Sequence, residues 1–282
     1  MRNLLSANFS RLGKNRLFWV CLIGVFGFSA AVSLYEVHFN TVRRVSLGFA
    51  PYEYGLEDIT FNFVPFLGLF VAVFTAMFLG TEYADGTLRN KLIVGHRRAD
   101  IYLANFIVCA VGGVALVLAW FLGGLTAAPF MGLWAFGVQK GLLCLLIVVL
   151  FTVSFVALFT LIGMLSSNKA TTVAVTVVLF VVMLIVSSSL INRLSQPESI
   201  YDYVLSEDGE LVMLGMKPNP SAVTGTMRVV FQGLANILPA AQSLQIATLD
   251  IPHPEQQLLS SLGLILFSVV VGLMLFKRKD LK

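Results

Sequence analysis

Six long apolar segments that contain no Asp, Glu, Lys, Arg or His constrain this chain more than any other feature of its sequence. A helix needs about 20 apolar residues to cross a hydrocarbon core of about 30 Å, and each segment has about that length. The segments are residues 17–35, 61–79, 101–125, 141–163, 170–191 and 258–276. The sequence is 57% hydrophobic and 12% charged, with a mean hydropathy of +0.87, which is more apolar surface than a soluble domain of 282 residues can bury. We therefore predict an all-α membrane protein whose six transmembrane helices lie within residues 17–282.

The segment before the first span has the pattern of a helix that lies in the membrane interface. Within residues 1–16, Leu4, Leu5, Phe9 and Leu12 share one helical face, and the basic residues lie mostly on the other. Two interpretations remain open, a positively charged anchor or a docking surface for a partner, and both place the helix on the cytoplasmic side. The first apolar segment is longer than the usual core of a signal peptide, so we expect an uncleaved first helix.

The distribution of Lys and Arg predicts the orientation in the membrane. With both termini in the cytoplasm, 13 of the 19 basic residues lie on the inner side, whereas 11 of the 15 acidic residues lie outside. This bias agrees with the preference of cytoplasmic loops for positive charge. The formal charge of +4 then arises from two opposed faces, and it gives no support to a nucleic-acid partner. The cationic face is expected to meet anionic lipid or a cytoplasmic protein.

The polar loop at residues 80–100, between the second and third spans, has the pattern of a folded hairpin. Asp85 and Gly86 form a turn pair, Thr87 is a residue type that caps helices, and Gly95 is suited to end the short helix that follows. A loop that folds in this way is expected to dock a partner.

A shorter inner turn separates the fourth and fifth spans. Its Ser166, Ser167 and Asn168 are available to cap the fifth helix. The turn is either a second, smaller contact with a partner subunit or a simple connection.

The outer segment at residues 192–257 is the largest polar part of the chain. Within it, residues 222–238 are semi-apolar, with Arg228 and Asn236 nearer the polar face. A seventh span here would place Arg228 in lipid, which is unfavourable. We expect instead an amphipathic or re-entrant helix on the outer leaflet that is broken at Pro239. The first outer loop is expected to be a connector with Tyr52 and Tyr54 as interface anchors.

The chemistry-bearing motifs of common enzymes are missing from the sequence. It has no Gly-x-x-x-x-Gly-Lys-Ser/Thr loop, no His-Glu-x-x-His, no paired-cysteine pattern and no Gly-x-Ser-x-Gly. The spans also lack the ionisable groups that ion-coupled carriers place at mid-membrane. We therefore expect no ATPase, no metal and no cofactor in this chain, and a permease whose energy arrives through its cytoplasmic loops.

Two segments resemble type-2 ABC exporter permeases. The first follows the second span and contains Glu82-x-x-x-Gly86-Thr87-Leu88-Arg89, then Arg97, Arg98 and Tyr102-Leu103. The second, Asn236 to Gln242, is similar to the region before the sixth helix of that family. The resemblance implies a bacterial inner-membrane protein surrounded by lipid. It also implies two ATP-binding cassette ATPase subunits, which bind ATP and Mg, and a second permease that is either another copy of this chain or a paralogue.

The resemblance also assigns roles within the hairpin and the spans. Glu82 would hold the base of the second span, Gly86 and Thr87 would form the cap, and the second and fifth spans would line the dimer interface and the path. The docking face would be Leu88, Leu92 and Ile93, with Asp85 and Arg89 in the same coupling element.

The substrate is expected to be amphipathic or hydrophobic, because Phe, Val, Leu, Ser and Thr would line the path. An antimicrobial peptide, a drug or a lipid-like molecule fits, and many small bacterial members of the family confer peptide or drug resistance. The alternative is a non-transporting membrane sensor or assembly subunit whose outer loop binds a ligand. Co-purification of an ATPase separates the two classes.

Overall fold

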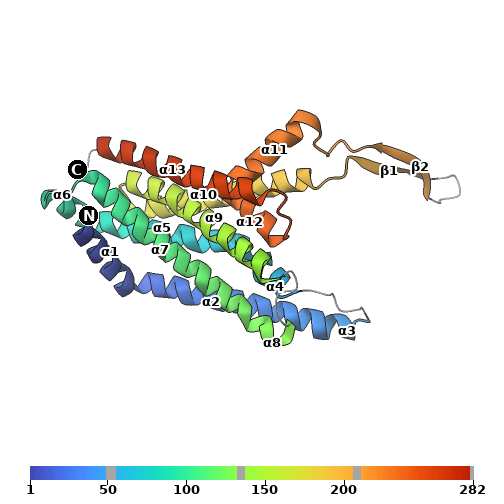
Figure 1. Cartoon of the computed structure of the whole chain (residues 1–282), viewed down its shortest axis with the longest axis horizontal. Coiled ribbons are helices and arrows are strands. Elements are labelled where there is room, and N and C mark those ends of the chain that lie inside the picture. The colour runs from blue at the N-terminus through green and yellow to red at the C-terminus, as the bar shows by residue number, and fades with distance from the viewer. Residues whose placement is uncertain (49–54, 132–136, 206–210, 280–282) are drawn as a thin grey trace.

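The protein is a bundle of long helices in the computed structural model, which describes residues 1–48, 55–131, 137–205 and 211–279 (Figure 1). Among these residues, six helical segments are long and apolar enough to cross a membrane, and each contains one predicted span. They are Arg16–His38 (α2), Leu56–Ala84 (α4 to α5), Arg98–Phe130 (α7 into α8), Val138–Leu165 (α9), Lys169–Leu194 (α10) and Pro254–Arg278 (α13). The predicted all-α membrane fold with six spans is confirmed.

The remaining elements are short ones that precede or connect the spans, together with the parts into which the second and third spans divide. They are α1 (Arg2–Lys14), the π-helix η1 (Phe39–Arg43), α3 (Arg44–Ser46), α4 (Leu56–Asn62), the 3-10 turn η2 (Val64–Phe66), α5 (Leu67–Ala84), α6 (Thr87–Ile93), α7 (Arg98–Gly124), the 3-10 turn η3 (Leu125–Ala127), α8 (Ala128–Met131), β1 (Ser199–Leu205), β2 (Leu211–Pro218), α11 (Gly225–Ile237) and α12 (Pro239–Ala247). The second span is interrupted at η2, where Pro65 lacks the N–H that a continuous helix requires.

The helix α5 forms the centre of the bundle. In the second span, Leu56–Ala84, which contains α5, 67% of an apolar stretch of 18 residues is buried, against 22% in α10 and 17% in α13. Close packing around α5 depends on glycine, because a Cβ at Gly68 would lie 2.3 Å from the ring of Phe180, and one at Gly112 of α7 would lie 2.5 Å from the ring of Phe74. Such small residues let helix backbones approach closely. The outer helices leave long apolar faces uncovered.

The two ends of the bundle differ in what they carry (Figure 1). At one end, called here the terminal end, lie α1, α6 and the last turn of α13. At the other, called the hairpin end, lie α3, α8, α11 and α12, and the β1–β2 hairpin extends away from the helices. The N-terminal helix and the end of the last span therefore lie at one end, as an even number of spans requires. The side of the membrane that this end faces remains a prediction.

The outer segment differs from expectation in two respects. It contains an antiparallel hairpin that was not predicted from the sequence, in which Tyr201 pairs with Met216 and Tyr203 with Met213. The break at Pro239 is confirmed, since Pro239 is the first residue of α12. The helix α11 leaves its apolar residues exposed, as an amphipathic helix on the outer leaflet would, and a second helix, α12, packs against α9 and α10. Tyr52 and Tyr54 lie outside the described residues.

Candidate functional site

Glu82, near the C-terminal end of α5, is the centre of a buried polar cluster at the terminal end. Its carboxylate accepts hydrogen bonds from Arg11 Nη1 of α1 and Lys91 Nζ of α6. It also accepts a hydrogen bond from Asn105 Nδ2 of α7, at 2.6 Å. The Glu82 side chain is buried completely. Four helices, the consecutive α5, α6 and α7 together with the distant α1, therefore meet at one carboxylate.

Asn8 of α1 completes what we call the Glu82 cluster, which consists of Asn8, Arg11, Glu82, Lys91 and Asn105. The Nδ2 of Asn8 donates to Asn105 Oδ1 at 2.7 Å, and its Oδ1 accepts from Lys91 Nζ at 2.9 Å. Arg11 also lies over the ring of Phe78, with its guanidinium carbon 3.9 Å from the ring centroid. Charges this deeply buried persist only when they are paired and hydrogen-bonded.

The structure changes the expected role of the N-terminal helix. Leu4, Asn8 and Leu12 face the bundle, Phe9 is exposed, and Arg11 points toward Glu82. The segment is therefore bound to the ends of α5 and α7 through polar as well as apolar contacts. The expected arrangement had only an apolar face in contact and the basic residues on the opposite face.

The electrostatics of the cluster place two cations beside one carboxylate. Burial is the largest cause that lowers the pKa of the Lys91 ammonium, and the nearby charge of Arg11 lowers it further. The Glu82 carboxylate opposes this shift through its charge and its hydrogen bond. The balance means that Lys91 depends on Glu82 to remain charged at this depth.

The local geometry of α6 confirms part of the expected cap and corrects part of it. Gly86 is the N-cap, and its left-handed backbone (φ 65°) is one that glycine adopts readily. Thr87 is the first helical residue and not the cap, because its hydroxyl donates to the backbone carbonyl of Glu82 at 3.2 Å. Gly95 (φ 93°) ends the helix as predicted. Asp85 lies in the exposed turn that precedes the helix.

The expected docking face of α6 is mostly wrong. Leu88 is only 2% exposed, and Leu92 packs against the core, because the i, i+4 stripe of this helix faces the bundle. The exposed apolar residues are instead Ile93 (73%) and Val94 (76%). Arg89 is also exposed.

A groove of about 290 Å³ separates α1 from α6 beside these exposed residues. Its lining combines polar and apolar side chains of both helices: Asn3, Leu4, Ala7, Thr87, Asn90, Lys91, Val94 and His96. The groove and the Glu82 cluster share Lys91. A molecule seated in the groove would therefore contact the cluster directly.

The short turn after α9 is tied to the same end of α5. Asn168 caps α10 as predicted, since its Oδ1 accepts from the backbone N of Ala170 at 2.9 Å. The hydroxyl of Tyr83 in α5 donates to the carbonyl of Met164 at 2.5 Å. Lys279 donates to the carbonyl of Ser166 at 2.9 Å, while Ser167 lies within the turn. The C-terminal segment is thus hydrogen-bonded to the turn, and no sequence motif predicted this contact.

The residues predicted in the outer element do not form one site. Asn236 lies in a buried network of amides and hydroxyls, in which Gln242 Nε2 donates to the Asn236 carbonyl at 2.6 Å and Ser261 Oγ donates to Gln242 Oε1 at 2.9 Å. Arg228 lies on α11 at a separate polar pocket. Within the described parts of the chain, His, Cys, Asp and Glu form no group of three that could hold a metal ion.

Together, the fold and the Glu82 cluster define a polytopic membrane protein in which a folded loop and an N-terminal helix are bound to the base of the central span. A family model described as ABC-2 family transporter protein matches residues 4–187, which is more than half of the chain. The chain belongs to this family. It is an ABC transporter permease, and membership implies partnership with an ATP-binding cassette subunit. In a comparison with curated proteins, nothing matches the chain.

Proposed function

We propose that this protein is the transmembrane subunit of an ATP-driven exporter and that its ATPase subunit docks on α6 and the groove beside α1. The Glu82 cluster carries this proposal. It joins the helix α6 to the central span α5 through an ion pair between Lys91 and the buried carboxylate of Glu82. ATP and magnesium would bind to the partner subunit.

The contacts around α6 support the transmission of force. Because Lys91 and Arg11 both bind one buried carboxylate, a displacement of α6 or α1 pulls on the base of α5. Separating these charges leaves them unpaired in a medium that solvates them poorly, so the cluster resists stretching. The helix α5 then packs along α10 toward the hairpin end. Movement of the ATPase subunits would be relayed from one end of the bundle to the other.

A cavity at the hairpin end is suited to the proposed substrate. It has a volume of about 490 Å³, and α4, η2, α10 and α12 supply its walls. The lining is largely apolar, with Phe63, Phe66 and Leu184, and a few polar groups that include Ser188 and Asn192. This mixture favours an amphipathic or hydrophobic molecule such as a peptide, a drug or a lipid-like compound.

The arrangement of the spans also favours a particular dimer contact. The resemblance implied that the second and fifth spans share the interface, but α5 is mostly covered within one chain. The exposed apolar face of α10, which includes Val178, Val182 and Ile185, is available to a second permease. We infer that two permeases, identical or paralogous, meet at α10, and that each binds one ATPase subunit.

A single charge at the exposed tip of α6 tests the docking surface. We expect Val94→Asp to lower co-purification of the ATPase subunit from native membranes about tenfold or more, because it buries an unpaired charge in the contact. The matched control is Val138→Asp, since Val138 is also well exposed (69%) but starts α9 at the hairpin end. Equal co-purification in both variants would contradict docking at α6. An ATPase that never co-purifies with the wild-type chain would favour a non-transporting sensor.

A further inference from the structure

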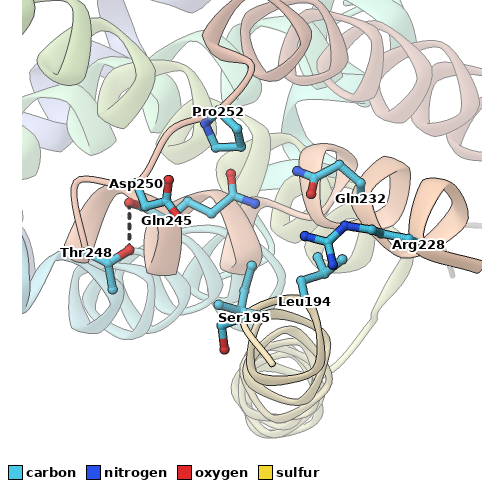
Figure 2. Close-up of a pocket in the computed structure, with 9 residues that line it drawn as sticks. Leu194, Ser195, Arg228, Gln232, Gln245, Thr248, Asp250 and Pro252 are labelled. Carbon is cyan, nitrogen blue, oxygen red and sulfur yellow. Dashed lines mark hydrogen bonds between the residues drawn. The ribbon is translucent and has the colours of Figure 1, made fainter. Parts of the chain in front are cut away.

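A polar pocket of about 190 Å³ lies at the hairpin end, between the end of α10 and the two helices of the outer segment (Figure 2). Arg228 and Gln232 reach into it from α11, and Gln245, Thr248 and Asp250 approach from the opposite side. Leu194 and Ser195 form its base at the end of α10. This volume is far more than a single water requires, so the pocket has room for a polar group of several atoms.

The pocket contains one cation and one anion that do not neutralise each other. Arg228 makes a long hydrogen bond from Nη1 to the carbonyl of Val223, at 3.5 Å. In the described part of the chain, neither Arg228 nor Asp250 takes part in an ion pair within 4.0 Å. The guanidinium and the carboxylate therefore keep their capacity to bind charged groups, and they offer it from two sides of the same pocket.

The polar pocket adjoins the apolar cavity described above. Ile191 and Thr248 line both, so the two spaces meet at the end of α10. On the apolar side, Phe66 and Leu184 continue the lining toward the spans. The combined site has a charged compartment at the hairpin end and an apolar compartment that extends along α10. A ligand that fills both must have a charged head and an apolar tail.

We propose that this site binds a phospholipid whose head carries both a phosphate and an ammonium group. The phosphate would accept hydrogen bonds from the Arg228 guanidinium, and the ammonium would donate to the Asp250 carboxylate, with Gln232 and Gln245 as neutral partners. The acyl chains would lie in the apolar cavity that the proposed function assigns to a lipid-like substrate, so the inference names one member of that substrate class. Binding itself requires only this chain.

Both charges are needed to explain why a zwitterion is favoured. A head with phosphate alone would satisfy Arg228 but would lie against the Asp250 carboxylate, which opposes a negative ligand. A purely cationic head would pair with Asp250 but would be repelled by the Arg228 guanidinium. A head with both charges pairs each group, and such charge-assisted hydrogen bonds are stronger than neutral ones.

Lipid titration of the purified, delipidated full chain, followed by native mass spectrometry, tests the proposal. The probes are dioleoyl phosphatidylethanolamine, dioleoyl phosphatidylglycerol and a dioleoyl trimethylammonium lipid. We expect the wild-type chain to bind the phosphatidylethanolamine most tightly. Arg228→Gln should weaken that binding about tenfold or more, the loss expected when a hydrogen bond between charged groups is removed.

The second variant separates this site from non-specific lipid binding. Asp250→Asn should weaken phosphatidylethanolamine binding and strengthen phosphatidylglycerol binding, because it removes the only carboxylate that lines the pocket in the described structure. Arg193→Gln is the matched control, since Arg193 is an exposed cation on α10 that does not line the pocket. A wild-type preference for the anionic lipid, or unchanged affinities in both variants, would overturn the proposal. No nucleotide or ATPase is present, so the result is independent of the test at Val94.

Discussion

The two ends of the bundle are both held by buried polar side chains, but they use different chemistry. At the terminal end, two cations converge on the carboxylate of Glu82. At the hairpin end, the buried groups that join α11, α12 and α13 are neutral amides and hydroxyls, with Gln242 and Ser261 at their centre. Outside this network, Asp202 and Lys217 pair on the exposed hairpin at 2.6 Å.

This difference has a mechanical consequence. A buried ion pair favours one geometry strongly, because separating its charges in an apolar medium is unfavourable. A neutral hydrogen bond contributes about 0.5 to 1.5 kcal/mol and exchanges its partner more readily. The terminal end is therefore suited to transmit displacement without deforming, whereas the hairpin end is suited to rearrange around a ligand.

The largest effect is expected from removal of the charge at Glu82. In Glu82→Gln, Arg11 and Lys91 remain in place without their carboxylate, and a broken buried pair of this kind destabilises a protein by about 3 to 5 kcal/mol. We expect a clearly lower melting temperature for the detergent-solubilised chain, measured by intrinsic fluorescence.

The matched control makes the same chemical change at the other end. Asp202→Asn removes a carboxylate from an ion pair whose members are both partly exposed, and such pairs contribute about 0 to 1 kcal/mol. The comparison between the ends fails if the two variants melt at the same temperature.

A smaller effect is expected from the neutral network. Gln242→Met retains the size of the side chain but leaves the buried Ser261 hydroxyl without its acceptor, and an unsatisfied buried group costs about 1 to 3 kcal/mol. The decrease in melting temperature should be smaller than for Glu82→Gln. Gln139→Met, at an exposed position near the start of α9, should leave it unchanged. A loss for Gln242→Met as large as that for Glu82→Gln would show that charge does not distinguish the two ends.

The same comparison shows what the sequence could predict. The six spans were predictable because a long apolar segment without charge rarely forms anything but a membrane helix. The helix α6 was predictable because Gly86 and Gly95 mark its limits. The stripe of Leu88 and Leu92 was misread, since an apolar i, i+4 pair fits a core contact as well as a docking contact. The face that a short helix turns toward the bundle depends on the helices it packs against, and its own residues do not identify those helices.

The partners of Glu82 could not be predicted for a related reason. Asn8 and Asn105 lie 97 residues apart in sequence, and no local spacing connects them. The β1–β2 hairpin was missed because a bulge between Asp202 and Tyr203 disturbs the alternation by which a strand is recognised. Polar residues that are distant in sequence come together only when the helices pack into the bundle. A lone acid at the end of an apolar span was the one available signal.

The smallest predicted effect concerns Lys279, which follows the last turn of α13. Its titration is expected to make the stability of the terminal end depend on pH. Its ammonium donates to the hydroxyl of Tyr83, at 3.0 Å, and to the carbonyls of Met164 and Ser166. Burial lowers the pKa of Lys279 from 10.5 to about 8. Between these values the unfolded chain binds more protons than the folded chain, so stability should rise as the pH increases from about 8 to 10.5. Below pH 8 both states are protonated, and the penalty for burying the charge is present in full.

Melting curves across this pH window test the role of Lys279. We expect the melting temperature of the wild type to increase relative to Lys279→Met between about pH 8 and about pH 10.5, the range that the two pKa values define. Lys277→Met, which changes an exposed side chain on the same helix, should show no such relative change. A gap between wild type and Lys279→Met that stays constant across this range would mean that Lys279 is solvated like any surface lysine, and that the charged character of the terminal end stops at the Glu82 cluster.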